Sequence, residues 1–144
     1  MVDTNVLFSM ILFPTDHSNR LKRALAAHQI VLCSYVVEET KQVVERKVPD
    51  RARDIDKFFA SLPFTLAGTP TGLDPSAYPA IRGLDDLPVL AAAMAEQVDA
   101  LVTGDKDFAA VDVDQPTILT PRQLVEQWAA GGRPPAWARG AGAA

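Results

Sequence analysis

Acidic side chains recur where a predicted strand ends or a predicted helix begins. The acids of interest are Asp3, Glu39, Asp86, Asp105 and Asp107. In a parallel α/β sheet the carboxyl ends of the strands meet at one edge, so side chains placed there converge. Like charges that are brought together repel, and a fold gathers them only around a cation. Because oxygen-only ligands select a hard ion, the sequence points to Mg²⁺ or Mn²⁺.

Each acid also has a purely structural interpretation, and the sequence leaves both open. Asp86, with Asp85 before it, could cap its helix. Asp105 and Asp107 could form a turn in Gly-Asp-Lys-Asp, which is a common role of Asp. Asp3 is the hardest to explain in this way, because a carboxylate directly after a buried strand needs partners. The metal hypothesis therefore rests on the joint placement of the acids.

Helical geometry separates Glu39 from its neighbour Glu38. The buried stripe of the helix predicted over residues 34–46 is defined by Val36, Val37, Val43 and Val44. With about 100° per residue, Glu39 lies about 100° from the centre of that stripe and Glu38 about 160°. We therefore expect Glu39 at the border of the core, where it can reach a cleft, and Glu38 in solvent.

Composition limits the class of protein. The chain has 144 residues, 48% hydrophobic and 22% charged, which is typical of one globular domain. A single cysteine, Cys33, excludes an internal disulfide, and His17 and His28 lack the spacing of zinc ligands. The net charge of −4 is not that of a protein that holds nucleic acid by its overall charge. The apolar run at residues 6–13 is too short for a signal peptide or a membrane span, so we expect a cytoplasmic protein.

The elements that must position the acids follow from the hydrophobic pattern. The predicted strands are residues 1–2, 30–33, 64–67, 100–103 and 117–119. The predicted helices are residues 6–13, 17–27, 34–46, 51–61, 87–97 and 121–130. Short apolar strands that alternate with helices predict a parallel α/β sheet covered on both faces.

Several local signals refine these boundaries. We expect Asp16 or Ser18 to cap the second helix, Ser34 to cap the third, and Thr120 to cap the last. The first strand is short, since strands usually run to about 5–6 residues, so we expect the natural chain to begin before Met1. Residues 131–144 are rich in Gly, Pro and Ala and are predicted to form a flexible tail.

Four segments resemble the motifs of the PIN domain in order and spacing. They are residues 2–7 with Asp-Thr-Asn, 34–39, 86–93, and 101–108 with Thr-Gly-Asp-Lys-Asp-Phe. Residues 118–122 resemble the last strand and helix start of that family. The resemblance covers about residues 1–130 as one domain. It implies a three-layer α/β sandwich with a central, mainly parallel five-stranded sheet and helices on both faces.

The resemblance also implies roles for individual residues. The catalytic acids would be Asp3, Glu39, Asp86 and Asp105. Of these, the metal would be held by Asp3, Asp86 and Asp105, and Asp107 would be a fifth acid at the site. Polar support would come from Asn5 and Thr103, while Lys106 would contact the scissile phosphate or merely offset the acids.

In function, the chain most resembles the VapC-like toxins of bacterial toxin–antitoxin operons. This implies a metal-dependent endoribonuclease that uses Mg²⁺ or Mn²⁺ to activate a water molecule and leaves a 5′-phosphate on the product. It also implies a small antitoxin partner, for which the helices around residues 21–27 and 58–62 are candidate docking surfaces, and a homodimer. No membrane partner is expected.

Two other classes of function are weighed against this one. A receiver-like Mg²⁺-binding regulatory domain would need paired acids after its first strand, where this chain has one. A catalytically silent PIN-type binding module would be expected to lack one of the acids. Six basic residues, Lys41, Arg46, Lys47, Arg51, Arg53 and Lys57, are compatible with either a solvated helical face or a rim that guides phosphates.

Overall fold

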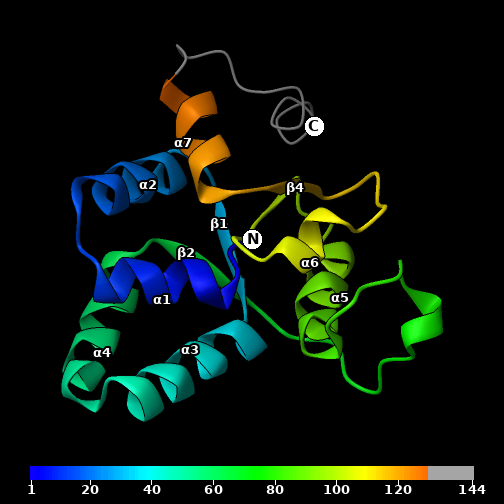
Figure 1. Ribbon diagram of the computed structural model, residues 1–144, viewed down its shortest axis with the longest axis horizontal. Helices are drawn as coiled ribbons and strands as arrows, with labels where there is room; N and C mark the ends of the chain where they lie inside the picture. The colour runs from blue at the N-terminus through cyan, green and yellow to red at the C-terminus, as the bar shows by residue number, and fades with distance from the viewer. Residues whose placement is uncertain (130–144) are drawn as a thin grey trace.

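The computed structural model describes residues 1–129 of the chain, and Figure 1 shows how its elements are arranged. The helices are α1 (Thr4–Leu12), α2 (Asp16–Ala26), α3 (Ser34–Lys47), α4 (Ala52–Ser61), α5 (Leu87–Ala95), α6 (Lys106–Ala109) and α7 (Pro121–Ala129). The strands are β1 (Ile30–Cys33), β2 (Phe64–Ala67), β3 (Ala100–Val102) and β4 (Thr117–Leu119). Three short 3₁₀ turns, η1 (Pro49–Arg51), η2 (Pro75–Ala77) and η3 (Leu84–Asp86), lie in the connections. The flexible tail predicted at 131–144 lies outside the described residues.

All strand pairing in the described chain is parallel, as predicted. β1 pairs with β2, β3 pairs with β4, and Val2 forms an isolated parallel bridge with Val102. The expectation of one five-stranded sheet is not met within residues 1–129, where the hydrogen bonds form two separate two-stranded ladders. Met1 and Val2 form the short segment between the two ladders. Because they bond only to β3, they do not join the ladders into one sheet. Figure 1 places the N-terminus between the two strand pairs.

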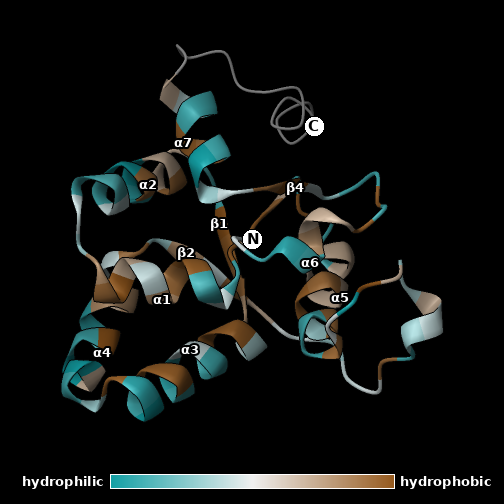
Figure 2. Cartoon of the chain, viewed as in Figure 1, coloured by the Kyte–Doolittle hydropathy of each residue, from teal (hydrophilic) through white to brown (hydrophobic). Residues whose placement is uncertain are grey.

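The core lies between these ladders and the helices. Its largest fully buried side chains include Leu7, Leu32, Leu90, Leu101 and Phe108. Helix α5 is apolar on nearly every side and is buried over most of its length, whereas α2 and α4 alternate apolar and polar faces, as Figure 2 shows. Helix α1 packs against α3, and α2 packs against α7. Burial of apolar surface is therefore what holds the strand ends and helix starts in place.

Helix α3 confirms the expected difference between the two glutamates. Glu38 is exposed and Glu39 is half-buried. The centre of the buried stripe, however, includes Thr40 as well as Val36 and Val44. The Thr40 hydroxyl donates to the Val36 carbonyl at 2.7 Å, so this polar side chain is satisfied inside the helix and can be buried.

The predicted caps were correct for one helix of three. Thr120 caps α7, because its hydroxyl accepts from Gln123 N at 3.1 Å while the Gln123 side chain accepts from Thr120 N at 2.9 Å. For α2 the prediction was wrong, since the side chain of Thr15 accepts from Ser18 N. Ser34 does not cap α3 either, because its hydroxyl bonds with that of Thr69 at 3.0 Å.

Hydropathy adds one further observation on the helices. Among residues 1–129, none of the helices has both the length and the apolar character needed to cross a membrane.

Candidate metal centre

Three carboxylates meet beyond the end of β3. Asp86, Asp105 and Asp107 each place one oxygen so that the three atoms lie within 4.8 Å of one another. Asp86 closes η3, and the other two flank the first residue of α6. The structure thus groups two of the predicted metal ligands with Asp107, the acid that was expected only as an addition. All three side chains are half-buried, so they are fixed by the fold yet open to solvent on one side.

The interpretation of these acids as helix caps holds for one of them and not for another. Asp105 does cap α6, because its carboxylate accepts from Asp107 N at 2.8 Å. Asp86 occupies the N-cap position of α5, but its side chain makes no capping hydrogen bond. Helix capping therefore explains Asp105 in part and does not explain Asp86.

Asp3 lies beside this group and is held on both of its carboxylate oxygens. Oδ1 accepts from Thr4 N at 2.8 Å, and Oδ2 accepts from the Thr103 hydroxyl at 2.8 Å. Only 4% of Asp3 is exposed, and burial is the main cause that raises its pKa above the ordinary value. The hydrogen bonds oppose this shift, whereas the negative charges of Glu39 and Asp105 add to it. Asp3 and Glu39 are therefore electrostatic neighbours of the cluster, although neither belongs to the group of three.

Asn5 and Thr103 connect the start of the chain to the loop after β3. The Asn5 amide nitrogen donates to Asp3 at 3.3 Å and to the Thr103 hydroxyl at 3.4 Å, while its oxygen accepts from Gly104 N at 3.1 Å. The Thr103 hydroxyl also accepts from Asp105 N at 3.1 Å. This network of hydrogen bonds joins Asp3 to Asp105 through Asn5 and Thr103.

The charge of the acids is not neutralised by basic side chains. The ion pairs found among residues 1–129 join Arg51 to Asp54 and Arg122 to Glu126, and both lie outside the cluster. Lys106 is exposed. The pKa of Asp86 is raised to about 7, first by burial and then by the charges of Asp105, Asp3 and Asp107. Such repulsion is what a bound cation relieves, and the oxygen-only donor set fits a hard divalent ion.

The backbone of Gly83 lies close to the carboxylates, a feature that was not predicted from the sequence. A Cβ atom built on Gly83 would lie 2.7 Å from Asp86 Oδ2 and 3.5 Å from Asp107 Oδ2. Any other residue at this position would therefore crowd the ligand oxygens. The signal in the sequence is only a glycine shortly before an acidic pair, which is too common to indicate a site by itself.

Tyr35 is a second residue at the site that the sequence did not single out. Its hydroxyl donates to the backbone oxygen of Asp85 at 3.1 Å. Tyr35 and Glu39 are one helical turn apart, so they share a face of α3. The spacing of Tyr35 and Glu39 can be read from the sequence, whereas the contact of Tyr35 with Asp85 in η3 cannot.

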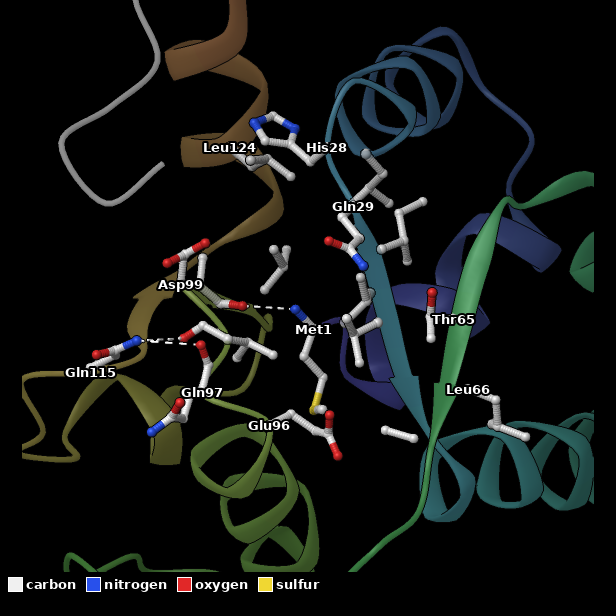
Figure 3. A pocket seen from close by; sticks show the side chains of 18 of the residues that line it. Met1, His28, Gln29, Thr65, Leu66, Glu96, Gln97, Asp99, Gln115 and Leu124 are labelled. Atoms are coloured by element: carbon white, nitrogen blue, oxygen red, sulfur yellow. Dashed lines mark hydrogen bonds between the residues drawn. The ribbon is translucent and has the colours of Figure 1, made fainter. Parts of the chain in front are cut away.

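A cavity lies elsewhere in the molecule. It has a volume of about 970 Å³ and is lined by Met1 and Val2, by parts of β1, β2 and β3, and by residues that precede β1 and β3. Figure 3 shows Met1 at its centre, with Gln29 on one side and Asp99 on the other. The Met1 amino group donates to the Ala100 carbonyl at 2.8 Å. This cavity is the gap between the two ladders, and none of the clustered acids lines it.

Comparison with known families explains the arrangement of the acids. The sequence profile of the PIN domain matches residues 1–107, a span that includes every acid of the cluster. No curated protein matches the chain. PIN domains are commonly metal-dependent nucleases, and the acidic cluster is a group of side chains that could hold the ion. Because the profile spans most of the chain, the protein belongs to the PIN domain family.

Proposed function

We propose that this PIN domain is a metal-dependent endoribonuclease that hydrolyses RNA phosphodiester bonds and acts as the toxin of a toxin–antitoxin pair. The observation that carries the proposal is the convergence of Asp86, Asp105 and Asp107 beside Asp3, with no basic side chain paired to any of them among residues 1–129. Uncompensated carboxylates at the carboxyl end of a strand are the chemistry of a site for Mg²⁺ or Mn²⁺.

The ligands in this proposal are Asp3, Asp86 and Asp105, with Asp107 and Glu39 alongside. A bound divalent ion would supply a water molecule acidified enough to attack phosphorus and would stabilise charge on the leaving oxygen. Asp3 contributes a fixed orientation, because Thr4 N and the Thr103 hydroxyl hold both of its oxygens. Fixed ligands reduce the reorganisation needed when substrate binds.

Fewer basic residues are available to guide RNA phosphates than the sequence contains, because some of them have structural contacts. Arg51 donates to Asp54 at 2.7 Å and to the Ile11 carbonyl at 2.8 Å, so it stabilises the fold. Lys47 lies 5.8 Å from the centre of the Phe8 ring, in a cation–π contact. We therefore leave Arg51 and Lys47 out and assign the guiding of RNA phosphates to the remaining basic residues of the set and to Lys106. They are Lys41, Arg46, Arg53, Lys57 and Lys106.

The proposal includes a small antitoxin and a homodimer. The apolar side chains Leu21, Ala24 and Leu25 of α2 are buried in the core, so that face is not available to a partner. A groove of about 280 Å³ between α1, α2 and α4 is lined by Met10, Phe58 and other residues. This groove supports an antitoxin docking site that uses Phe58 and excludes the buried face of α2.

Cleavage of end-labelled RNA by the full chain tests the enzymatic part. We expect cleavage in Mn²⁺ or Mg²⁺, none in EDTA, and products with a 5′-phosphate. Glu39→Gln should slow cleavage, whereas the exposed neighbour Glu38→Gln is the matched control and should not. Binding of RNA without any cleavage would favour the silent binding module, and equal cleavage of single-stranded DNA would contradict the assignment to RNA.

Two further measurements test the partners. A short upstream gene whose product binds the chain and blocks cleavage would support the toxin assignment. Sedimentation at micromolar concentration should show a dimer, and a clean monomer would contradict that part of the proposal.

A further inference from the structure

Tyr35 links the two parts of the chain that carry Glu39 and Asp86. It is the second residue of α3, one turn before Glu39. Its hydroxyl reaches the backbone oxygen of Asp85, fifty residues away in the sequence. Asp85 lies in η3, directly before Asp86. A single hydrogen bond therefore joins α3 to the turn that presents Asp86.

The Tyr35 side of this link is rigid. Tyr35 N donates to the Thr69 hydroxyl at 2.9 Å, and the hydroxyls of Ser34 and Thr69 bond to each other at 3.0 Å. Thr69 N in turn donates to the Ser34 hydroxyl at 3.2 Å. The Tyr35 ring also packs against the main hydrophobic core. Because a tyrosine side chain has few rotatable bonds, these contacts determine where its hydroxyl lies.

The η3 side has few restraints of its own. The turn is three residues long, its N-cap is Gly83 without a side-chain capping bond, and none of its residues is buried. Leu84, its one large apolar side chain, is 67% exposed. Asp86 N bonds to the Gly83 carbonyl at 3.1 Å, which is a contact within the turn. The bond from Tyr35 is thus a restraint from outside the turn on the segment that carries Asp86.

We propose that Tyr35 is a positioning residue for the metal centre. Through Asp85, its hydroxyl holds η3 so that the Asp86 carboxylate meets Asp105 and Asp107 at the spacing a divalent ion needs. The inference rests on the proposed function only in requiring that the cluster binds a divalent ion, and it does not depend on the substrate.

Tyr35→Phe removes the hydroxyl and keeps the ring that packs on the core. The matched control is Tyr78→Phe, because Tyr78 is the only other tyrosine and is also half-buried. We expect Tyr35→Phe to raise the Kd for Mn²⁺ by roughly tenfold, as loss of supporting contacts does at other metal sites. Cleavage should recover at saturating Mn²⁺, and the melting temperature in EDTA should stay close to that of the wild type.

Amide hydrogen exchange in EDTA gives a second readout that needs neither metal nor RNA. Residues 84–87 should exchange faster in Tyr35→Phe than in the wild type and in Tyr78→Phe. Equal Mn²⁺ affinity of wild type and Tyr35→Phe would overturn the positioning role. Mn²⁺ binding without RNA cleavage would contradict the proposed function and leave the affinity test of Tyr35 in force, whereas a wild type that binds no Mn²⁺ would overturn both.

Discussion

The acidic cluster lies beyond the end of β3, whereas the large cavity lies between the β1–β2 ladder and the β3–β4 ladder. The cavity of about 970 Å³ lies between β1 and β3, and its lining mixes apolar side chains with polar ones such as Gln29, Asp99 and Gln115. The cluster brings together three carboxylates, and the charges of Asp105 and Asp107 contribute to the raised pKa of Asp86. A divalent ion would relieve this repulsion, and among the described residues no comparable group of three acids lines the cavity. Charge identifies the candidate site here, and volume does not.

The largest expected difference between the two regions is in catalysis. Asp105→Asn removes a ligand charge and should reduce RNA cleavage by at least about 100-fold, since loss of mere supporting contacts already costs 10–100-fold. Asp99→Asn, which changes an acid that lines the cavity, should leave the cleavage rate unchanged. Both rates are measured on labelled RNA in Mn²⁺. Equal loss in the two variants would abolish the distinction between the regions.

Asp3→Asn should abolish cleavage and leave the fold intact. The raised pKa of Asp3 means that burial disfavours its charged form, so a neutral side chain of the same shape relieves this cost. We expect the melting temperature in EDTA at neutral pH to be equal to that of the wild type or higher. If the bonds from Thr4 N and Thr103 dominate instead, the variant would lose about 1–3 kcal/mol of stability. Thermal unfolding together with the cleavage assay separates the two outcomes.

The stability of the metal-free chain should depend on pH through Asp86. Its pKa is raised from 3.8 to about 7 in the folded chain. Between about pH 4 and 7 the folded chain therefore holds a proton that the unfolded chain has released, so the free energy of unfolding falls as the pH rises. In EDTA, Asp86→Asn should melt above the wild type at pH 8, and this difference should shrink by pH 5. A difference that grows as the pH falls would contradict the assigned shift.

Substitution of two glycines, one at the acidic cluster and one at the cavity, should give the smallest effect of these tests. In Gly83→Ala the new Cβ would lie 2.7 Å from Asp86 Oδ2, so we expect roughly tenfold weaker Mn²⁺ binding. In Gly68→Ala, at the cavity, the new Cβ would have no atom within 4 Å and should change nothing at the metal centre. Neither glycine has a positive φ, so neither change strains the backbone. Titration of both variants with Mn²⁺ is the measurement, and equal affinities would show that the close approach of Gly83 to Asp86 is unimportant.

Local patterns in the sequence were sufficient for most of the elements. The apolar runs at 30–33, 64–67 and 117–119 coincide with β1, β2 and β4. The reciprocal bonds of Thr120 and Gln123 follow from residues three apart, so the cap of α7 could be predicted. Helical periodicity also distinguished Glu39 from Glu38 correctly. These features depend on neighbours within one or two turns, and their physical causes are therefore present in the order of the residues.

What the sequence by itself determined is where the acids lie along the elements, at the end of a strand or in the first turns of a helix. The tertiary structure decided that Asp107 joins Asp86 and Asp105, that the backbone of Gly83 lies close to them, and that Tyr35 reaches Asp85. It also decided that Val2 bridges only to β3, so that two ladders form within residues 1–129. These outcomes depend on atoms far apart in the chain that meet within a few ångströms. Their positions are set by packing of the whole core, and no local pattern encodes a distance of that kind.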